Sequence, residues 1–86
     1  MEQQLDGNAA AGVLRELFPF EMTTAEATCK NCSTTGAIGS LAAYIHDMGT
    51  VVRCPSCDHV LIRIVHAKGR YWLDMSGVQV LQIAEL

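Results

Sequence analysis

The sequence predicts a mainly β protein, in which a small antiparallel sheet follows one N-terminal α-helix. Only residues 6–18 carry a helix-length amphipathic pattern, and residues 23–83 form short apolar or alternating runs separated by turn residues. In addition, four cysteines occur in a chain of 86 residues, a length at which a small core often needs a staple. We expect a single domain over residues 1–86, with the helix at about 6–18 and the cysteine-bearing β region at about 23–83.

The expected helix has recognisable signals at both ends. Asp6 or Asn8 can cap its first turn with a side-chain oxygen. Pro19 ends it, because proline disfavours helical geometry at the residue before it. The apolar stripe that we expect to pack on the sheet consists of Leu14, Leu17 and Phe18.

The strands are expected after residue 21, where the pattern changes. Lys68-Gly69 is typical of a two-residue hairpin turn, Asp47-Met48-Gly49 and Ser76-Gly77 are expected to be turns, and Gly36 and Gly39 punctuate a loop. Because the helix precedes all the strands, a parallel β-α-β arrangement is not expected. The expected strands are residues 23–29, 41–46, 51–53, 60–67, 70–75 and 78–83.

The cysteines form two pairs of the same spacing. Cys29-Lys30-Asn31-Cys32 is followed by twenty-one residues and then by Cys54-Pro55-Ser56-Cys57. Two residues between cysteines let the backbone fold into a tight knuckle that aims both sulfurs at one point. Two knuckles supply four thiolates in a tetrahedron, which suits Zn²⁺. We therefore predict one Zn²⁺ per chain, with the ligands Cys29, Cys32, Cys54 and Cys57.

Other uses of these cysteines are less favoured. Disulfides need an oxidising compartment, and the first residues lack the basic and apolar regions of a secretory signal. A redox CxxC should open a helix, whereas Cys57 leads into an expected strand. Iron would give a rubredoxin-like electron carrier with the same ligands, and ligand type alone does not separate the two metals. His59 is a minor alternative ligand.

The charge and composition bear on the partner. The formal net charge is −3, which disfavours a general nucleic-acid binder. The second half is more basic, and its cluster beside Tyr71 and Trp72 consists of Arg53, Arg63, Lys68 and Arg70. We expect a solvated strand face here, with Trp72 in the core and Arg63 close to Arg70 across a hairpin. Because 50% of the residues are hydrophobic, we also expect exposed apolar surface that a protein partner or a second copy covers.

The chain resembles an uncharacterised bacterial zinc-ribbon family, a domain of unknown function. The matching segments are residues 5–9, the Cys29/Cys32 pair, residues 53–57, residues 60–63 and residues 72–74. The resemblance implies a bacterial cytoplasmic protein with a zinc-ribbon fold and no assigned activity. Ribbons often have glycine after the second cysteine of each knuckle, where φ tends to be positive, and this chain has Ser33 and Asp58 there.

These observations favour a small structural zinc-binding protein that acts as a protein-interaction module. A nucleic-acid-binding zinc ribbon is the first alternative, and a rubredoxin-like electron carrier is the second. A filled four-thiolate site has no open position for substrate, and no catalytic constellation or small-molecule site is evident. We therefore do not expect an enzyme. No apolar run is long enough to span a membrane, and a cytoplasmic location is expected.

Overall fold

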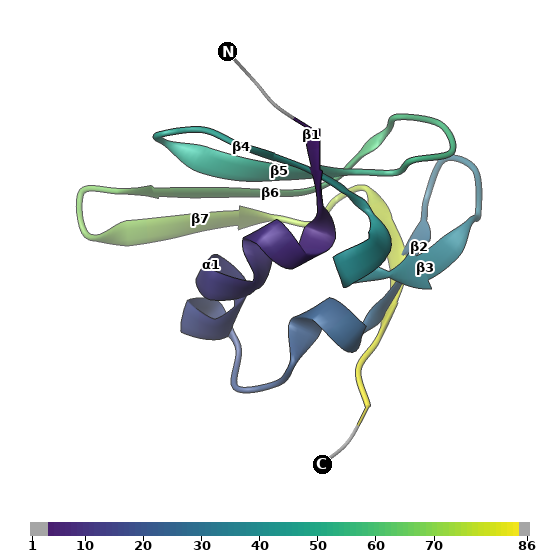
Figure 1. Cartoon of the computed structure of the whole chain (residues 1–86), viewed down its shortest axis with the longest axis horizontal. Helices are drawn as coiled ribbons and strands as arrows, with labels where there is room; N and C mark the ends of the chain where they lie inside the picture. Colours follow the sequence, from purple (N-terminus) through teal and green to yellow (C-terminus); the bar gives the residue numbers. More distant parts are fainter. Residues whose placement is uncertain (1–3, 85–86) are drawn as a thin grey trace.

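The computed structural model describes residues 4–84, which form a mainly β protein with one short N-terminal α-helix (Figure 1). The helix α1 spans Ala11–Leu17, and three 3-10 helices span Gly7–Ala10 (η1), Met22–Thr24 (η2) and Ile38–Ser40 (η3). The strands are β1 (Gln4–Asp6), β2 (Glu26–Cys29), β3 (Thr35–Ala37), β4 (Ala42–Ile45), β5 (Gly49–Arg53), β6 (Val60–Ala67), β7 (Arg70–Asp74) and β8 (Val78–Gln82).

The strands form two antiparallel sheets. The five-stranded sheet has the order β1-β4-β5-β6-β7, and the three-stranded sheet has the order β3-β2-β8. The expected fold class is confirmed, but the single expected sheet is divided. The division arises because β8 turns away from β7 and pairs with β2, so that Thr28 lies opposite Val80.

The expected helix begins and ends where its signals indicate, although its first turn is 3-10. The Asp6 carboxylate accepts a hydrogen bond from the backbone N–H of Asn8, at 3.1 Å, and caps η1. Phe18 is extended, with φ −128° and ψ 140°, as expected for a residue before proline. Among residues 4–84, no helix is both long and apolar enough to cross a membrane.

In the β6–β7 hairpin, β6 and the turn are as the sequence predicts, and β7 begins as expected but ends one residue early, at Asp74. Lys68 and Gly69 both have positive φ, 53° and 72°, which is the geometry of a type I′ turn. This turn twists in the same sense as the strands, so it brings β7 back along β6 in register. Val65 consequently lies opposite Trp72, and Arg63 lies opposite Asp74.

The core lies between α1 and one face of the five-stranded sheet, which we call the inner face. Leu14 of α1 is buried together with Val52, Ile62 and Ile64 of the sheet. Leu17 and Phe18 pack against this cluster from its margin. The predicted stripe of α1 therefore covers the sheet, although only Leu14 is fully enclosed.

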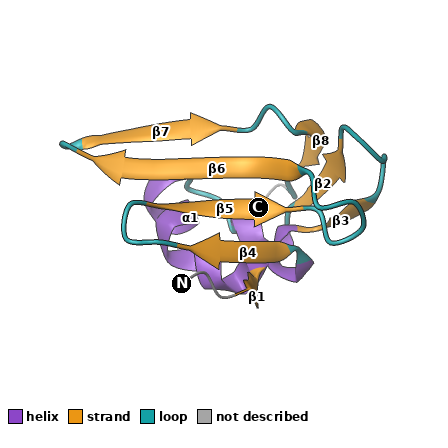
Figure 2. Cartoon of the chain, turned by 90° about the horizontal axis from the view of Figure 1, so that it is seen from above, coloured by secondary structure: helices purple, strands orange, loops and turns teal. Residues whose placement is uncertain are grey.

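The opposite face of the five-stranded sheet, the outer face, has no helix over it in the described part of the chain (Figure 2). Trp72 belongs to this face because it pairs with Val65, one residue away from buried Ile64. Its side chain is 50% exposed. The expectation that Trp72 anchors the core is therefore wrong, because strand alternation turns it away from α1.

Candidate metal centre

Two different sheets deliver the two cysteine pairs. Cys29 is the last residue of β2 in the three-stranded sheet. Cys54 comes directly after β5 in the five-stranded sheet. The four sulfurs of Cys29, Cys32, Cys54 and Cys57 lie within 4.8 Å of one another. The structure thus brings together all four predicted ligands at the junction of the sheets.

Both knuckles have the same backbone hydrogen bonds. In the first, the carbonyl oxygen of Cys29 accepts from the N–H of Ser33 at 2.9 Å, and the N–H of Cys29 donates to Thr34 at 2.8 Å. In the second, the carbonyl oxygen of Cys54 accepts from Asp58 at 2.8 Å, and its N–H donates to His59 at 2.9 Å. The two CxxC segments of this chain therefore have the same local backbone geometry.

The residue after each knuckle has the left-handed conformation expected from the resemblance. Ser33 and Asp58 both have φ of 65°. Glycine adopts this region without strain, whereas other residues lose roughly 1–2 kcal/mol there. At Asp58 the cost is offset in part by Arg53, whose guanidinium donates to the Asp58 carbonyl oxygen at 3.0 Å and lies 3.8 Å from its carboxylate.

Two of the distances between sulfurs match those around a tetrahedral metal ion. The Cys29 and Cys57 sulfurs are 3.7 Å apart, and those of Cys32 and Cys54 are 3.6 Å apart. Four thiolates about 2.3 Å from a central zinc would be separated from one another by ~3.8 Å. A disulfide requires about 2.05 Å between sulfurs, and all four cysteines are free. The four cysteines are therefore positioned to hold one metal ion.

The four thiols have unequal environments. Cys29 and Cys54 are buried, Cys57 is half-buried and Cys32 is exposed. Burial raises the pKa of the Cys29 thiol to about 11. Hydrogen bonding by the Thr34 hydroxyl, 3.2 Å away, lowers the pKa of the Cys32 thiol to about 6. A metal ion would displace a proton from Cys29, whereas Cys32 is already ionised at neutral pH.

The other predicted residues lie outside this cluster. His59 contributes its backbone carbonyl to the second knuckle and its ring does not belong to the group of candidate ligands. The basic residues do not form the expected cross-strand pair. Arg63 faces Asp74, and Arg70 faces Ala67. Arg53 lies over the ring of Tyr44 at 5.8 Å from its centroid.

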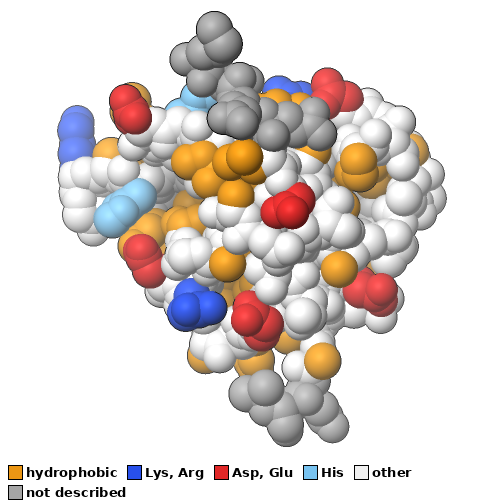
Figure 3. Space-filling model, viewed as in Figure 1, with side chains coloured by type: hydrophobic (Ala, Val, Ile, Leu, Met, Phe, Trp, Pro, Cys, Tyr) orange, Lys and Arg blue, Asp and Glu red, His pale blue; other side chains and the backbone are white. Residues whose placement is uncertain are grey.

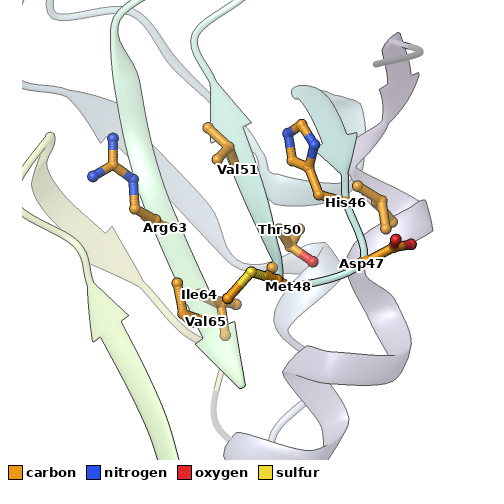
Figure 4. A pocket seen from close by; sticks show the side chains of 10 residues that line it. His46, Asp47, Met48, Thr50, Val51, Arg63, Ile64 and Val65 are labelled. Carbon is orange, nitrogen blue, oxygen red and sulfur yellow. The ribbon is translucent and has the colours of Figure 1, made fainter. Parts of the chain in front are cut away.

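A cavity of about 600 Å³ lies at the turn between β4 and β5, and sequence reasoning did not find it. Its polar groups include His46, Asp47 and Arg63, and the exposed Met48 side chain points from the turn toward β6 (Figure 4). The sequence feature that could have indicated this cavity is a turn flanked by apolar residues, but such turns are common in β proteins. It lies at the Gly49 end of β5, so it is separate from the cysteine centre at the Arg53 end.

The fold and the site define a class of protein: a small β protein whose two sheets meet at a four-cysteine centre able to bind a metal ion. The chain belongs to a family of unknown function, DUF6510, whose model matches residues 1–85. No curated protein and no solved structure matches the chain.

Proposed function

We propose that this protein is a small structural zinc-binding protein of the zinc-ribbon type that acts by binding another protein chain. The observation that carries the zinc assignment is the convergence of four sulfurs within 4.8 Å of one another, two pairs of which are 3.6 and 3.7 Å apart across the two knuckles. Zinc suits four thiolates with no open coordination position. The role of the ion is then to join the sheets, and it has no part in a reaction.

A reducing compartment is part of this proposal. The thiols are metal ligands only when they are not oxidised, and a bacterial cytoplasm keeps them reduced. Partly buried Cys57 and exposed Cys32 would be accessible to oxidants in a metal-free chain. We therefore propose a cytoplasmic location, and the resemblance to a bacterial zinc-ribbon family implies that the host is a bacterium.

The interaction role is supported by apolar side chains on the surface. Every residue of β7 is exposed, and its three central residues include two aromatic side chains, Tyr71 and Trp72. Aromatic residues are enriched in protein interfaces because they bury much area at low entropic cost. An 86-residue chain has a small core, so burial of Tyr71, Trp72 and Leu73 would add to its stability. Solvent exposure of such residues favours a partner at this strand.

The zinc assignment is tested by metal analysis of the purified protein. We expect about one zinc per chain and four thiols that do not react until a chelator is added. A metal-free folded protein, or one with red colour and visible absorbance from iron, would contradict it.

The interaction role is tested by cross-linking the tagged chain in its native cells. The interaction role would be contradicted if the chain cross-linked to no other protein and to no second copy of itself.

The nucleic-acid alternative has one observation in its favour, because the outer face of the sheet carries arginines beside Tyr44 and Trp72. Two of these arginines have acidic neighbours, since Arg53 contacts Asp58 and Arg63 lies opposite Asp74. On the α1 face, acidic side chains are dispersed and the few basic ones do not gather (Figure 3). We propose that nucleic acid is not the partner. Sub-micromolar, salt-sensitive binding of single-stranded DNA or RNA would reverse this assignment.

A further inference from the structure

The strand β7 is a free edge of the five-stranded sheet. It occupies the end of the order β1-β4-β5-β6-β7, and Figure 2 shows no described element beside it. Tyr71, Trp72 and Leu73 are 36%, 50% and 41% exposed. The strand contains no proline and no bulge, and its only charges are at its two ends. It thus lacks most features by which proteins prevent pairing at an edge.

The hairpin turn fixes which backbone groups of β7 are free. A two-residue turn closes with a hydrogen-bonded pair, here Ala67 and Arg70, and bonded and non-bonded pairs then alternate along the ladder. Arg70, Trp72 and Asp74 therefore direct their backbone groups toward β6. Tyr71 and Leu73 direct their N–H and C=O groups away from the sheet, where a further strand could bind them.

The sequence of β7 is complementary to itself when read in the opposite direction. In antiparallel pairing centred on Trp72, Arg70 lies opposite Asp74 of the second copy, and Asp74 lies opposite its Arg70. Tyr71 lies opposite Leu73 in both halves. The pair of Tyr71 and Leu73 is the hydrogen-bonded one, because both residues direct their backbone groups outward.

Side-chain directions agree with this register. Arg70, Trp72 and Asp74 alternate with Tyr71 and Leu73, so the first three share the outer face. The Trp72 side chains meet in a non-hydrogen-bonded pair, where opposing side chains are closest. Asp74 would then lie between Arg63 of its own chain, its partner on β6, and Arg70 of the second copy. Opposite charges flank an aromatic centre.

The other edge strands are less suited than β7 to pairing with a second copy. The strands β1 and β3 have three residues each. The edge strand β8 has five residues, Val78–Gln82, but none is charged, so charge would not select a register for it. Among the edge strands of residues 4–84, only β7 combines exposed apolar residues with opposite charges at equal distances from its centre.

We infer that two copies of this protein pair through β7, antiparallel and centred on Trp72, so that their five-stranded sheets join into one continuous sheet around a two-fold axis. This inference rests on the proposed interaction role and names the partner as a second copy. Two-fold dimers are the commonest soluble assemblies, and strand addition at an edge supplies main-chain hydrogen bonds without rearrangement of either chain.

Charge exchange tests the register. In sedimentation velocity on the zinc-loaded protein, Arg70→Glu alone and Asp74→Arg alone should each weaken the dimer by about tenfold or more, because each places like charges opposite one another. An equimolar mixture of the two variants should form a heterodimer, since opposite charges then face each other at both ends. Lys68→Glu is the matched control. It changes the net charge by the same amount outside the paired segment and should leave the dimer intact.

A backbone variant tests the edge independently. Leu73→Pro removes an N–H that faces away from β6, so it should abolish pairing while zinc content and β-sheet circular dichroism stay unchanged. Leu73→Val keeps the N–H and should still dimerise. A wild-type monomer at every concentration, or single variants that dimerise as well as the wild type, would overturn the inference. A failure of the mixture to form the heterodimer would also overturn it.

The result separates this inference from the proposed function. A monomer that binds a different protein through β7, with binding lost in Leu73→Pro, would overturn self-pairing and leave the interaction role standing. A folded protein without zinc would overturn the zinc assignment whatever its oligomeric state.

Discussion

The two cysteine knuckles have the same backbone geometry but different surroundings. Each has the same pair of hydrogen bonds from its first cysteine and a left-handed residue after its second. The first knuckle is held by a backbone bond from Lys30 to Gly77, at 2.9 Å, and by the Thr34 hydroxyl on Cys32. The second is held by Arg53 on Asp58.

This difference shows which properties belong to the motif and which belong to the fold. The hydrogen bonds of a knuckle belong to the motif, because they join its first cysteine to the residues four and five positions later. The supports come from a distant backbone group or from individual side chains, so they differ between the two knuckles. Changes to the ligands should therefore affect the whole centre, whereas changes to the supports should affect one knuckle.

The largest effect is expected at a buried ligand. Cys54→Ser should release the metal and unfold both sheets, because a structural zinc site contributes on the order of 10 kcal/mol to folding. Cys32→Ser at the exposed corner should retain a weakly bound ion, since water can complete the coordination there. Native mass spectrometry and circular dichroism would measure the two outcomes. Equal loss of metal in both variants would contradict the distinction.

The support of the first knuckle by Gly77 should be next in size. A Cβ at this position would lie 1.9 Å from the carbonyl oxygen of Val60, so Gly77→Ala must displace the backbone and should cost about 3 kcal/mol. Urea unfolding of the zinc-loaded protein would measure the loss. Gly12→Ala is the matched control, because its Cβ meets nothing within 4 Å and alanine favours a helix by about 1 kcal/mol. Similar destabilisation by both changes would count against the role of Gly77.

The hydroxyl of Thr34 should control how the site responds to acid. It is the largest of several causes, with the backbone N–H of Thr34 and the neighbouring thiols, that lower the pKa of the Cys32 thiol from 9.0 to about 6. This stabilisation of the folded thiolate is present at high pH and is lost as pH falls through about 6. Thr34→Val should raise that pKa and move the midpoint of zinc release to higher pH, by up to about one unit for each 1.4 kcal/mol lost.

A colorimetric zinc chelator would follow this release. Thr35→Val is the control, because its hydroxyl is 2.8 Å from that of Thr28 and belongs to the β2–β3 ladder. An unchanged pH midpoint of zinc release in Thr34→Val would contradict the prediction, because the hydroxyl would then have no effect on metal binding.

The smallest effects are expected at the left-handed residues. Ser33→Gly should stabilise the zinc-loaded protein by a few tenths of a kcal/mol up to about 1 kcal/mol, because the strain of positive φ that it removes exceeds the opposing cost of the greater chain entropy of the unfolded state. Asp58→Gly removes the same strain but also the contact with Arg53, so it should be close to neutral. Chemical denaturation of both variants would measure the difference, and a larger gain at Asp58 would contradict it.

Local features of the fold could be predicted from the sequence. The strand at 60–67 and the Lys68-Gly69 turn have their predicted bounds, because alternation and turn chemistry depend only on neighbours. The four cysteines converge as their spacing indicates. The left-handed Ser33 and Asp58 also occur where the resemblance implied.

Long-range features could not be predicted. The division into two sheets depends on β8 pairing with β2, and no local pattern in residues 78–83 records that partner. The short strand β1 was missed because its residues lie beside a helix cap. Trp72 was placed in the core by residue type, whereas the register of β7 with β6 places it on the outer face. The Lys68-Gly69 turn sets that register, but which face of the sheet is buried depends on where α1 packs.

The delivery of the knuckles by different sheets has a consequence for the order of folding. The strands from β4 to β7 form a meander of neighbours, whose turns close quickly. The second sheet must join Cys29 to Val78, about fifty residues apart in the chain, and such distant pairings are slow to form. A metal ion held by the four cysteines would join the end of β2 to the end of β5 and so shorten that search. Metal supply would then set the rate at which the last sheet assembles.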